Sequence, residues 1–149
     1  MPCAKDLMIT DVVTIEPDDS VEKAISLLLE HGLSGLPVTD PSGRLLGYLS
    51  EFDLIELYWK AKTRQDRVYH YMTRRLHQVR EDADLDTVAE QFRTCSIRQM
   101  LVTRDDRLVG AIRRRDLLQY VLRVRRQVTA VSPPLPLPVD VPVQSPAEL

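Results

Sequence analysis

The sequence predicts an α/β (α+β) fold, in which two copies of a β-α-β-β-α unit pack as one domain and an extended, proline-rich tail follows. Three observations lead to this prediction. The chain resembles itself at a spacing of 64 residues, both copies show strand-like and helix-like apolar patterns in the same order, and six of the ten prolines follow Ser132. We place the copies at residues 4–60 and 68–126, connected by the mostly polar residues 60–68, and the tail at 127–149.

The internal repeat becomes visible when the sequence is shifted against itself by 64 residues, or by 63 after the turn at Ser42-Gly43. Matching hydrophobic patterns accompany a small set of identities: Met8 with Met72, Asp18 with Asp82, Val38 with Val102, Gly47 with Gly110, and Asp53 with Asp116. One copy of about 50 residues buries too little apolar surface to be stable alone. We therefore expect the two copies to cover each other's sheets around a pseudo-twofold axis.

In the first copy, β-branched residues predict a strand at 12–15, and a helix then begins with Asp19 or Ser20 as its N-cap. An apolar stripe of helical period continues to Gly32, which suits the C-terminal cap. Residues typical of turns separate the next two strands. The remaining elements of this copy are strands at 36–39 and 45–49 and a helix from about Glu51 to Lys60.

The second copy repeats these elements in the same order. We expect strands at 76–79, 100–103 and 108–112, a first helix over Leu85 to Phe92, and a last helix from Asp116 to about Arg125. The tail differs, because proline can neither donate to a ladder nor continue a helix. We expect the tail to be extended or disordered; the alternative is that its apolar residues lie in a groove of a neighbouring chain.

Composition and charge exclude several classes of protein. The N-terminus lacks the continuous apolar stretch of a signal peptide, and no apolar run approaches the roughly 18 residues that span a bilayer. Cys3 and Cys95 form neither a disulfide framework nor a metal-ligand spacing, so we expect a cytoplasmic protein with reduced thiols and no metal site. Residues 1–63 have a net charge of −6 and residues 64–126 of +6, which suggests either electrostatic complementarity or two solvated faces.

The segment Gly47–Asp53 is the strongest candidate for a binding site. It ends a strand and begins a helix, so free backbone N–H groups and the positive helix end favour an anion there. Ser50 can donate a hydrogen bond to a phosphate, and Asp53 can accept from both hydroxyls of a ribose. The same Ser-x-x-Asp spacing is also that of a capping box, in which both side chains only complete the helix start.

The pattern KDLMITDVVTIEPDDSVEKAISLLLEHGLSGLPVTDPSGRLLGYLSEFDL closely resembles the CBS domain, named after cystathionine β-synthase. The stretch from Tyr71 to Leu118 is similar but more diverged, and the resemblance covers about residues 4–125. It implies a pair of CBS domains, or Bateman module, that forms a homodimer and regulates another protein in signal transduction. It also implies AMP, ADP, ATP or S-adenosylmethionine as a regulatory ligand, with no required cofactor.

The resemblance further implies contacts to the adenine. Apolar side chains would pack on the ring, and backbone amides would bind its edge. The positions that match the family's pattern for this role are Thr10, Val13, Ser34, Leu36 and Pro37.

The second copy departs from the family's pattern. Asp116 keeps the ribose position, but Arg113 stands where Ser50 stands in the first copy. The guanidinium group of Arg113 could bind phosphate in place of the hydroxyl. By the resemblance, Arg115 would reach the phosphates of the ligand held by the first copy, with Arg98 in reserve. We expect one good site and a second, around Asp116, that is weak or empty.

Three functions are compatible with the sequence. The first is a non-catalytic sensor that binds an adenosine-containing nucleotide and regulates a partner protein. The second is a dimeric scaffold with degenerate ligand sites, and the third is nucleic-acid binding by the arginine-rich second half. We rank the third last, because no aromatic stacking platform or DNA-binding motif accompanies the arginines. We expect no catalytic residues and no membrane contact, and we favour a head-to-tail dimer in which the acidic copy faces the basic one.

Overall fold

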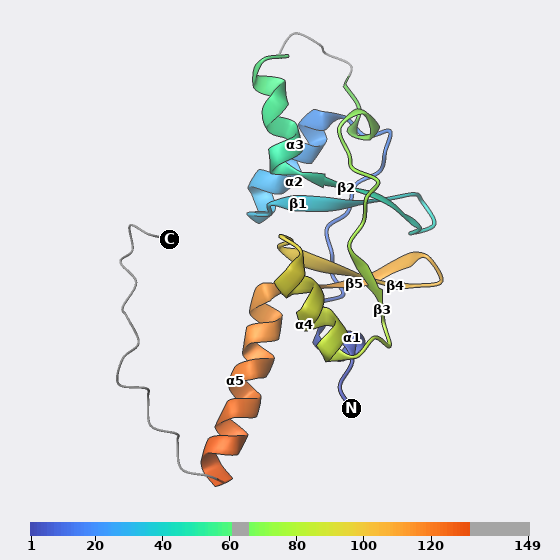
Figure 1. Cartoon of the computed structure of the whole chain (residues 1–149). Coiled ribbons are helices and arrows are strands. Elements are labelled where there is room, and N and C mark those ends of the chain that lie inside the picture. The colour runs from blue at the N-terminus through green and yellow to red at the C-terminus, as the bar shows by residue number, and fades with distance from the viewer. Residues whose placement is uncertain (61–65, 132–149) are drawn as a thin grey trace, which may run out of the picture.

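Each half of the chain forms its own small β-sheet, and the two sheets lie next to each other with helices beside them (Figure 1). The computed structural model describes residues 1–60 and 66–131. In the first sheet, β1 (Gly35–Thr39) pairs antiparallel with β2 (Leu45–Ser50). In the second sheet, β4 (Gln99–Arg104) pairs parallel with β3 (Gln78–Arg80) and antiparallel with β5 (Arg107–Arg113).

The helices follow the order that the repeat predicts. They are α1 (Ala4–Leu7), α2 (Val21–His31), α3 (Glu51–Ile55), α4 (Leu85–Thr94) and α5 (Arg114–Val131), with short 3-10 turns at Glu56–Tyr58 and Val68–His70. Ser20 is the N-cap of α2, since its Oγ accepts a hydrogen bond from Lys23 N at 3.1 Å. Gly32 ends α2 with a φ of 63°, a conformation that glycine adopts without strain.

The strand predicted at 12–15 is reduced to a single bridge between Ile15 and β1, so this prediction was wrong. Ile15 N donates to Pro37 O at 3.1 Å, but the next bond of a parallel ladder would need an N–H at position 37, and proline has none. At the equivalent position of the second copy, Leu101 N donates to His77 O at 3.3 Å, and β3 forms. On the other side of Ile15, the equivalent bond of the second copy runs from Glu81 N to Thr103 O at 3.0 Å, and Pro17, which stands where Glu81 stands, has no N–H to donate. Two prolines therefore make the two copies differ.

The segments that precede each copy cross over and pair with the opposite copy. Ile9 pairs with Ala111 of β5, and Thr73 pairs with Tyr48 of β2. These two pairs are related by the offset of the sequence repeat, as a pseudo-twofold axis requires, so the predicted fold is confirmed. Gly110 permits the close approach, because a Cβ atom there would lie only 2.6 Å from Ile9 O.

The crossing also exchanges parts of the hydrophobic core between the copies. Ala4, Leu7 and Met8 pack into the core of the second copy, whereas Val68 and Met72 pack into the core of the first. A third apolar cluster lies between the sheets and contains Leu45, Leu101 and Ala111, with Ile9, Val12, Tyr48, Leu76 and Leu108 packed against it. Each copy thus depends on the other for core residues, which is why one copy alone would be unstable.

Helix α5 extends to Val131, past its predicted end near Arg125. Its sequence contains no proline or glycine until Pro133, so nothing stops the helix earlier. Residues 127–131 are therefore helical and do not belong to an extended tail, while the predicted tail at 132–149 lies outside the described residues, as do residues 61–65 of the connection. Neither α5 nor any other described helix is long and apolar enough to cross a bilayer.

Candidate functional site

A cavity of about 410 Å³ lies between the two copies, beside the start of α3. Both copies and the crossing segment before β3 contribute to its walls, so the cavity belongs to the pair and not to a single repeat. Its polar lining includes Ser34, Tyr48 and Ser50 from the first copy, Thr73, Arg75 and His77 from the crossing segment, and Ser96, Arg98 and Gln99 from the junction of α4 and β4.

Ser50 and Asp53 form a capping box at the start of α3. Asp53 N donates to Ser50 Oγ at 3.1 Å, while Ser50 N and Ser50 Oγ donate to Asp53 Oδ2 at 3.0 and 2.8 Å. Glu51 N donates to Ser34 O at 2.9 Å, so two backbone N–H groups of this short helix already have partners. Ser50 lines the cavity. Asp53 does not, but within the described part of the chain its Oδ1 accepts no hydrogen bond.

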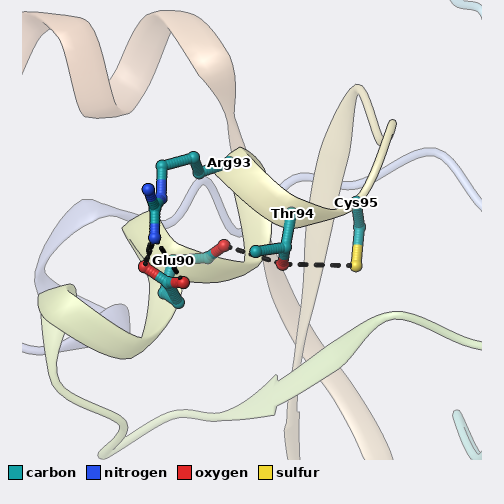
Figure 2. A network of polar contacts seen from close by, with 4 residues as sticks. All are labelled: Glu90, Arg93, Thr94 and Cys95. Carbon is teal, nitrogen blue, oxygen red and sulfur yellow. Dashed lines mark hydrogen bonds and ion pairs between the residues drawn. The ribbon is translucent and has the colours of Figure 1, made fainter.

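Polar contacts hold the end of α4, directly before the residues that line the cavity (Figure 2). Thr94 Oγ1 donates to Glu90 O at 2.9 Å, one turn back along the helix, and lies 3.8 Å from the Cys95 sulfur. Glu90 also forms an ion pair with Arg93 at 2.8 Å. These contacts hold the last turn of the helix, and residues 96–99, which follow directly, then line the cavity.

Tyr48 and Gln99 connect the two copies across the cavity. Gln99 Nε2 donates to Tyr48 Oη at 2.8 Å, and both residues line the cavity. Burial raises the pKa of Tyr48, although the hydrogen bond from Gln99 opposes this, so the phenol stays neutral near pH 7. The ring lies against Gly35, where a Cβ atom would be 2.6 Å from Tyr48 Cζ. A side chain larger than glycine at position 35 would push the ring out of place.

The lining of the cavity carries a positive charge. Arg75 and Arg98 are exposed, and neither guanidinium group has an ion pair or hydrogen bond within residues 1–60 and 66–131. His77 adds a half-buried imidazole, and Glu51 is the one carboxylate among the described lining residues. Guanidinium groups bind carboxylates and phosphates through a planar fork of donors. This arrangement is suited to an anion.

Of the five positions predicted for the adenine, only Ser34 lines this cavity. Ser34 lines the cavity, whereas Thr10 lines a separate hollow of about 180 Å³ and Val13 packs half-buried against the first core. Leu36 and Pro37 are fully buried, because every residue of β1 is covered on both faces of its sheet. These two side chains are core residues in this structure and do not line the cavity.

The candidates of the second copy bind each other. Arg113 Nε donates to Asp116 Oδ2 at 2.9 Å, and Arg113 Nη2 donates to Asp116 Oδ1 at 2.8 Å. Burial favours a higher pKa for Asp116, but the hydrogen bonds and the charge of Arg113 outweigh it and hold this pKa below its usual value. Arg115 is exposed in the first turn of α5 and does not line the cavity, whereas Arg98 does.

Several lining residues were not anticipated from the sequence, namely Tyr48, Thr73, Arg75, His77 and Gln99. The repeat contained a signal for them. A shift of 64 residues carries Val13, Ser34 and Pro37 onto His77, Arg98 and Leu101, all of which line the cavity. The adenine positions were predicted in the first copy, the copy that contains Ser50. Because the copies exchange their crossing segments, the equivalents of these positions in the second copy line the cavity together with Ser50.

The fold and the cavity together define a module of two β-α-β-β-α repeats with a basic, polar cavity at their junction. The described residues contain no group of three or more His, Cys, Asp or Glu side chains that could hold a metal ion. The family model of the CBS domain matches residues 4–60 and 68–123, and the chain belongs to this family.

Known proteins with the same domain differ widely in length. Inosine-5′-monophosphate dehydrogenase of Methanocaldococcus jannaschii is 31% identical over 117 residues, which are 78% of this chain but 23% of that enzyme. The structure of CBSX2 in complex with AMP matches with a TM-score of 0.75 at 28% identity, covering 83% of this chain and 98% of that one; CBSX2 is a CBS-pair protein of Arabidopsis thaliana. The CBS domain pair of protein MJ0100, in complex with 5′-methylthioadenosine and S-adenosyl-L-methionine, matches with a TM-score of 0.69 at 25% identity, covering 80% and 99%.

Proposed function

We propose that the cavity binds an adenosine-containing nucleotide and that the chain is a non-catalytic regulatory module that passes this signal to a partner protein. The observation that supports this most is that Ser50, Arg75 and Arg98 line the same cavity, and that neither guanidinium group has a partner among the described residues. A volume of about 410 Å³ falls in the usual range of about 300–1,000 Å³ for small-ligand sites. The AMP complex of CBSX2 supports the adenosine part of the proposal.

Ser50 and Asp53 would hold the sugar and the phosphate. Asp53 Oδ1 can accept one ribose hydroxyl without disturbing the capping box, which uses only Oδ2. The Ser50 hydroxyl can turn its proton from Asp53 to a phosphate oxygen while it still accepts from Asp53 N. Ile97 and Leu101 supply apolar surface for the base.

The charge of the lining ranks the possible ligands. ATP and ADP bring several negative charges to two arginines, and each charge-assisted hydrogen bond contributes more than a neutral one. S-adenosylmethionine brings one carboxylate but also a sulfonium and an ammonium group, so its net charge is positive and the two arginines disfavour it relative to AMP. We therefore expect ATP and ADP to bind more tightly than AMP, and AMP more tightly than S-adenosylmethionine.

Replacing Ser50 by alanine tests whether this serine contacts the ligand. Ser50→Ala should weaken ATP binding about tenfold, the effect of losing roughly 1.4 kcal/mol of hydrogen bonding, as measured by calorimetric titration. Ser20→Ala is the matched control, because Ser20 caps α2 as Ser50 caps α3 but does not line the cavity. Both variants should lose about 1 kcal/mol of stability. Equal affinities in the two variants, or no binding of any adenosine compound by the unaltered chain, would contradict the proposal.

We further propose that the regulatory unit is a head-to-tail homodimer. Large apolar side chains are exposed on both halves, forming an α3 face (Phe52, Ile55, Tyr58 and Trp59) and an α5 face (Leu118, Val121, Leu122 and Val128). Carboxylates flank the α3 face, whereas arginines flank the α5 face. Packing the α3 face of one chain on the α5 face of another covers apolar surface and brings opposite charges together.

Disulfide trapping distinguishes the two orientations of such a dimer. Tyr58→Cys and Leu122→Cys are made separately in a chain whose Cys3 and Cys95 are replaced by serine. A head-to-tail dimer should cross-link efficiently only when the two variants are mixed, as seen on a non-reducing gel. A head-to-head dimer would cross-link within each variant alone, and a monomer by light scattering would exclude both arrangements.

A further inference from the structure

The second copy has its own version of the Ser50–Asp53 pair, at Arg113 and Asp116. Arg113 donates three hydrogen bonds to this carboxylate: N to Oδ2 at 2.8 Å, Nε to Oδ2 at 2.9 Å and Nη2 to Oδ1 at 2.8 Å. The Asp116 side chain is 8% exposed, whereas that of Arg113 is 39% exposed. Both oxygens of a buried carboxylate are therefore occupied by the side chain that replaces the serine.

In the first copy, no side chain donates to both carboxylate oxygens of the equivalent Asp53 within the described residues. Asp53 uses only Oδ2 in its capping box, and among the described residues nothing donates to its Oδ1. Asp53 therefore keeps one carboxylate oxygen that accepts from no described protein donor and can take a ribose hydroxyl, whereas Asp116 keeps none. Neutral hydroxyl donors cannot readily displace a guanidinium group, because the bidentate ion pair is the stronger interaction. Asp116 is thus withheld from any sugar as long as Arg113 is present.

The offset of the repeat predicts which residues surround this pair. The offset of the repeat carries His77, Ile97 and Arg75 of the cavity onto Val13, Leu33 and Asp11. Val13 and Leu33 are half-buried apolar side chains, suited to pack on a base. Asp11, however, brings an acid where the cavity has an arginine. The pKa of Arg113 is raised, mainly by its hydrogen bond to Asp116 and further by the charges of Asp116 and Asp11, against the opposing effect of burial.

We infer that Arg113 is a built-in plug: its guanidinium group occupies the sugar position of a second nucleoside site, which opens when this side chain is shortened. The class of ligand rests on the function proposed above. Without Arg113, the two carboxylates of Asp11 and Asp116 outnumber Arg115, the other cation whose charge acts on Asp116, so the site should accept an uncharged nucleoside and disfavour a phosphate. As it stands, the chain has one nucleotide site.

The test is a calorimetric titration of the full chain and of Arg113→Ser with 5′-methylthioadenosine, which keeps the base and both ribose hydroxyls but has no phosphate. Arg113→Ser recreates the Ser-x-x-Asp start of α3 at α5, so the helix keeps a cap. We expect the stoichiometry to rise from one per chain to two. Arg107→Ser is the control for the loss of charge, since Arg107 lies at the start of β5, away from Asp116, and should leave the stoichiometry at one.

Two sites in the unaltered chain, or no gain of a site in Arg113→Ser, would overturn the inference. A parallel titration of the unaltered chain with AMP tests the proposed function by itself. If AMP does not bind but Arg113→Ser gains a site for 5′-methylthioadenosine, the proposed function fails and the plug stands. If Arg113→Ser does not fold, as judged by circular dichroism, Arg113→Thr removes the guanidinium group, keeps a hydroxyl as helix cap and should give the same gain.

Discussion

Replacing Arg75 and Arg98 together by alanine should weaken the binding of ATP about 100-fold and leave the binding of adenosine nearly unchanged. Each guanidinium group would contribute about 1.5 kcal/mol through charge-assisted hydrogen bonds, the low end of the range because both side chains are exposed. Two such losses correspond to about a factor of 100 in the dissociation constant. Calorimetric titrations with ATP and adenosine, at the same ionic strength, measure both effects.

The matched control for this pair removes two other exposed arginines, Arg74 and Arg107, which do not line the cavity. It changes the net charge equally, so it separates direct contact from the field of the whole protein. The ATP affinity of the control should stay within a few-fold of the original, and raising the salt concentration should weaken ATP binding to the unaltered chain. An equal loss in both double variants would mean that the arginines act only through long-range charge and do not contact the phosphates.

The repeat made most of the fold predictable. The offset of the repeat relates residues that the pseudo-twofold axis also relates. The alignment of the two copies therefore predicts that the pair Ile9 and Ala111 has an equivalent pair, Thr73 and Tyr48. What the repeat could not provide is which copy supplies each wall of the cavity. That depends on the crossing of the connecting segments, which is a tertiary contact without a local sequence pattern.

Local rules failed where single residues changed the hydrogen bonding. A run of β-branched residues predicts a strand before the first helix, but Pro17 and Pro37 both lack an N–H, and only one bridge remains, at Ile15. The sequence showed that Arg113 replaces the serine, but it could not show which group the Arg113 side chain binds. A phosphate and the nearby Asp116 are equally good partners for a guanidinium fork, and the structure shows the carboxylate.

The core position of Leu36 leads to the second large effect. Its side chain is fully buried among Ile15, Val38, Leu49 and Leu54, so Leu36→Ala should lower the free energy of unfolding by about 3 kcal/mol. Because Leu36 does not line the cavity, ATP affinity should be unchanged at temperatures where the variant is folded. Urea denaturation gives the stability, and calorimetry at 10 °C gives the affinity.

Leu101→Ala separates packing in the core from contact with the ligand. Leu101 is as deeply buried, at 2% exposure, but it also lines the cavity. Its truncation should cost a similar stability and in addition weaken ATP binding severalfold, because the base loses apolar surface. If Leu36→Ala weakened binding as much as Leu101→Ala, the adenine would have to lie against β1, where the family resemblance had first placed it. The difference between these two leucines therefore decides which side of the junction holds the base.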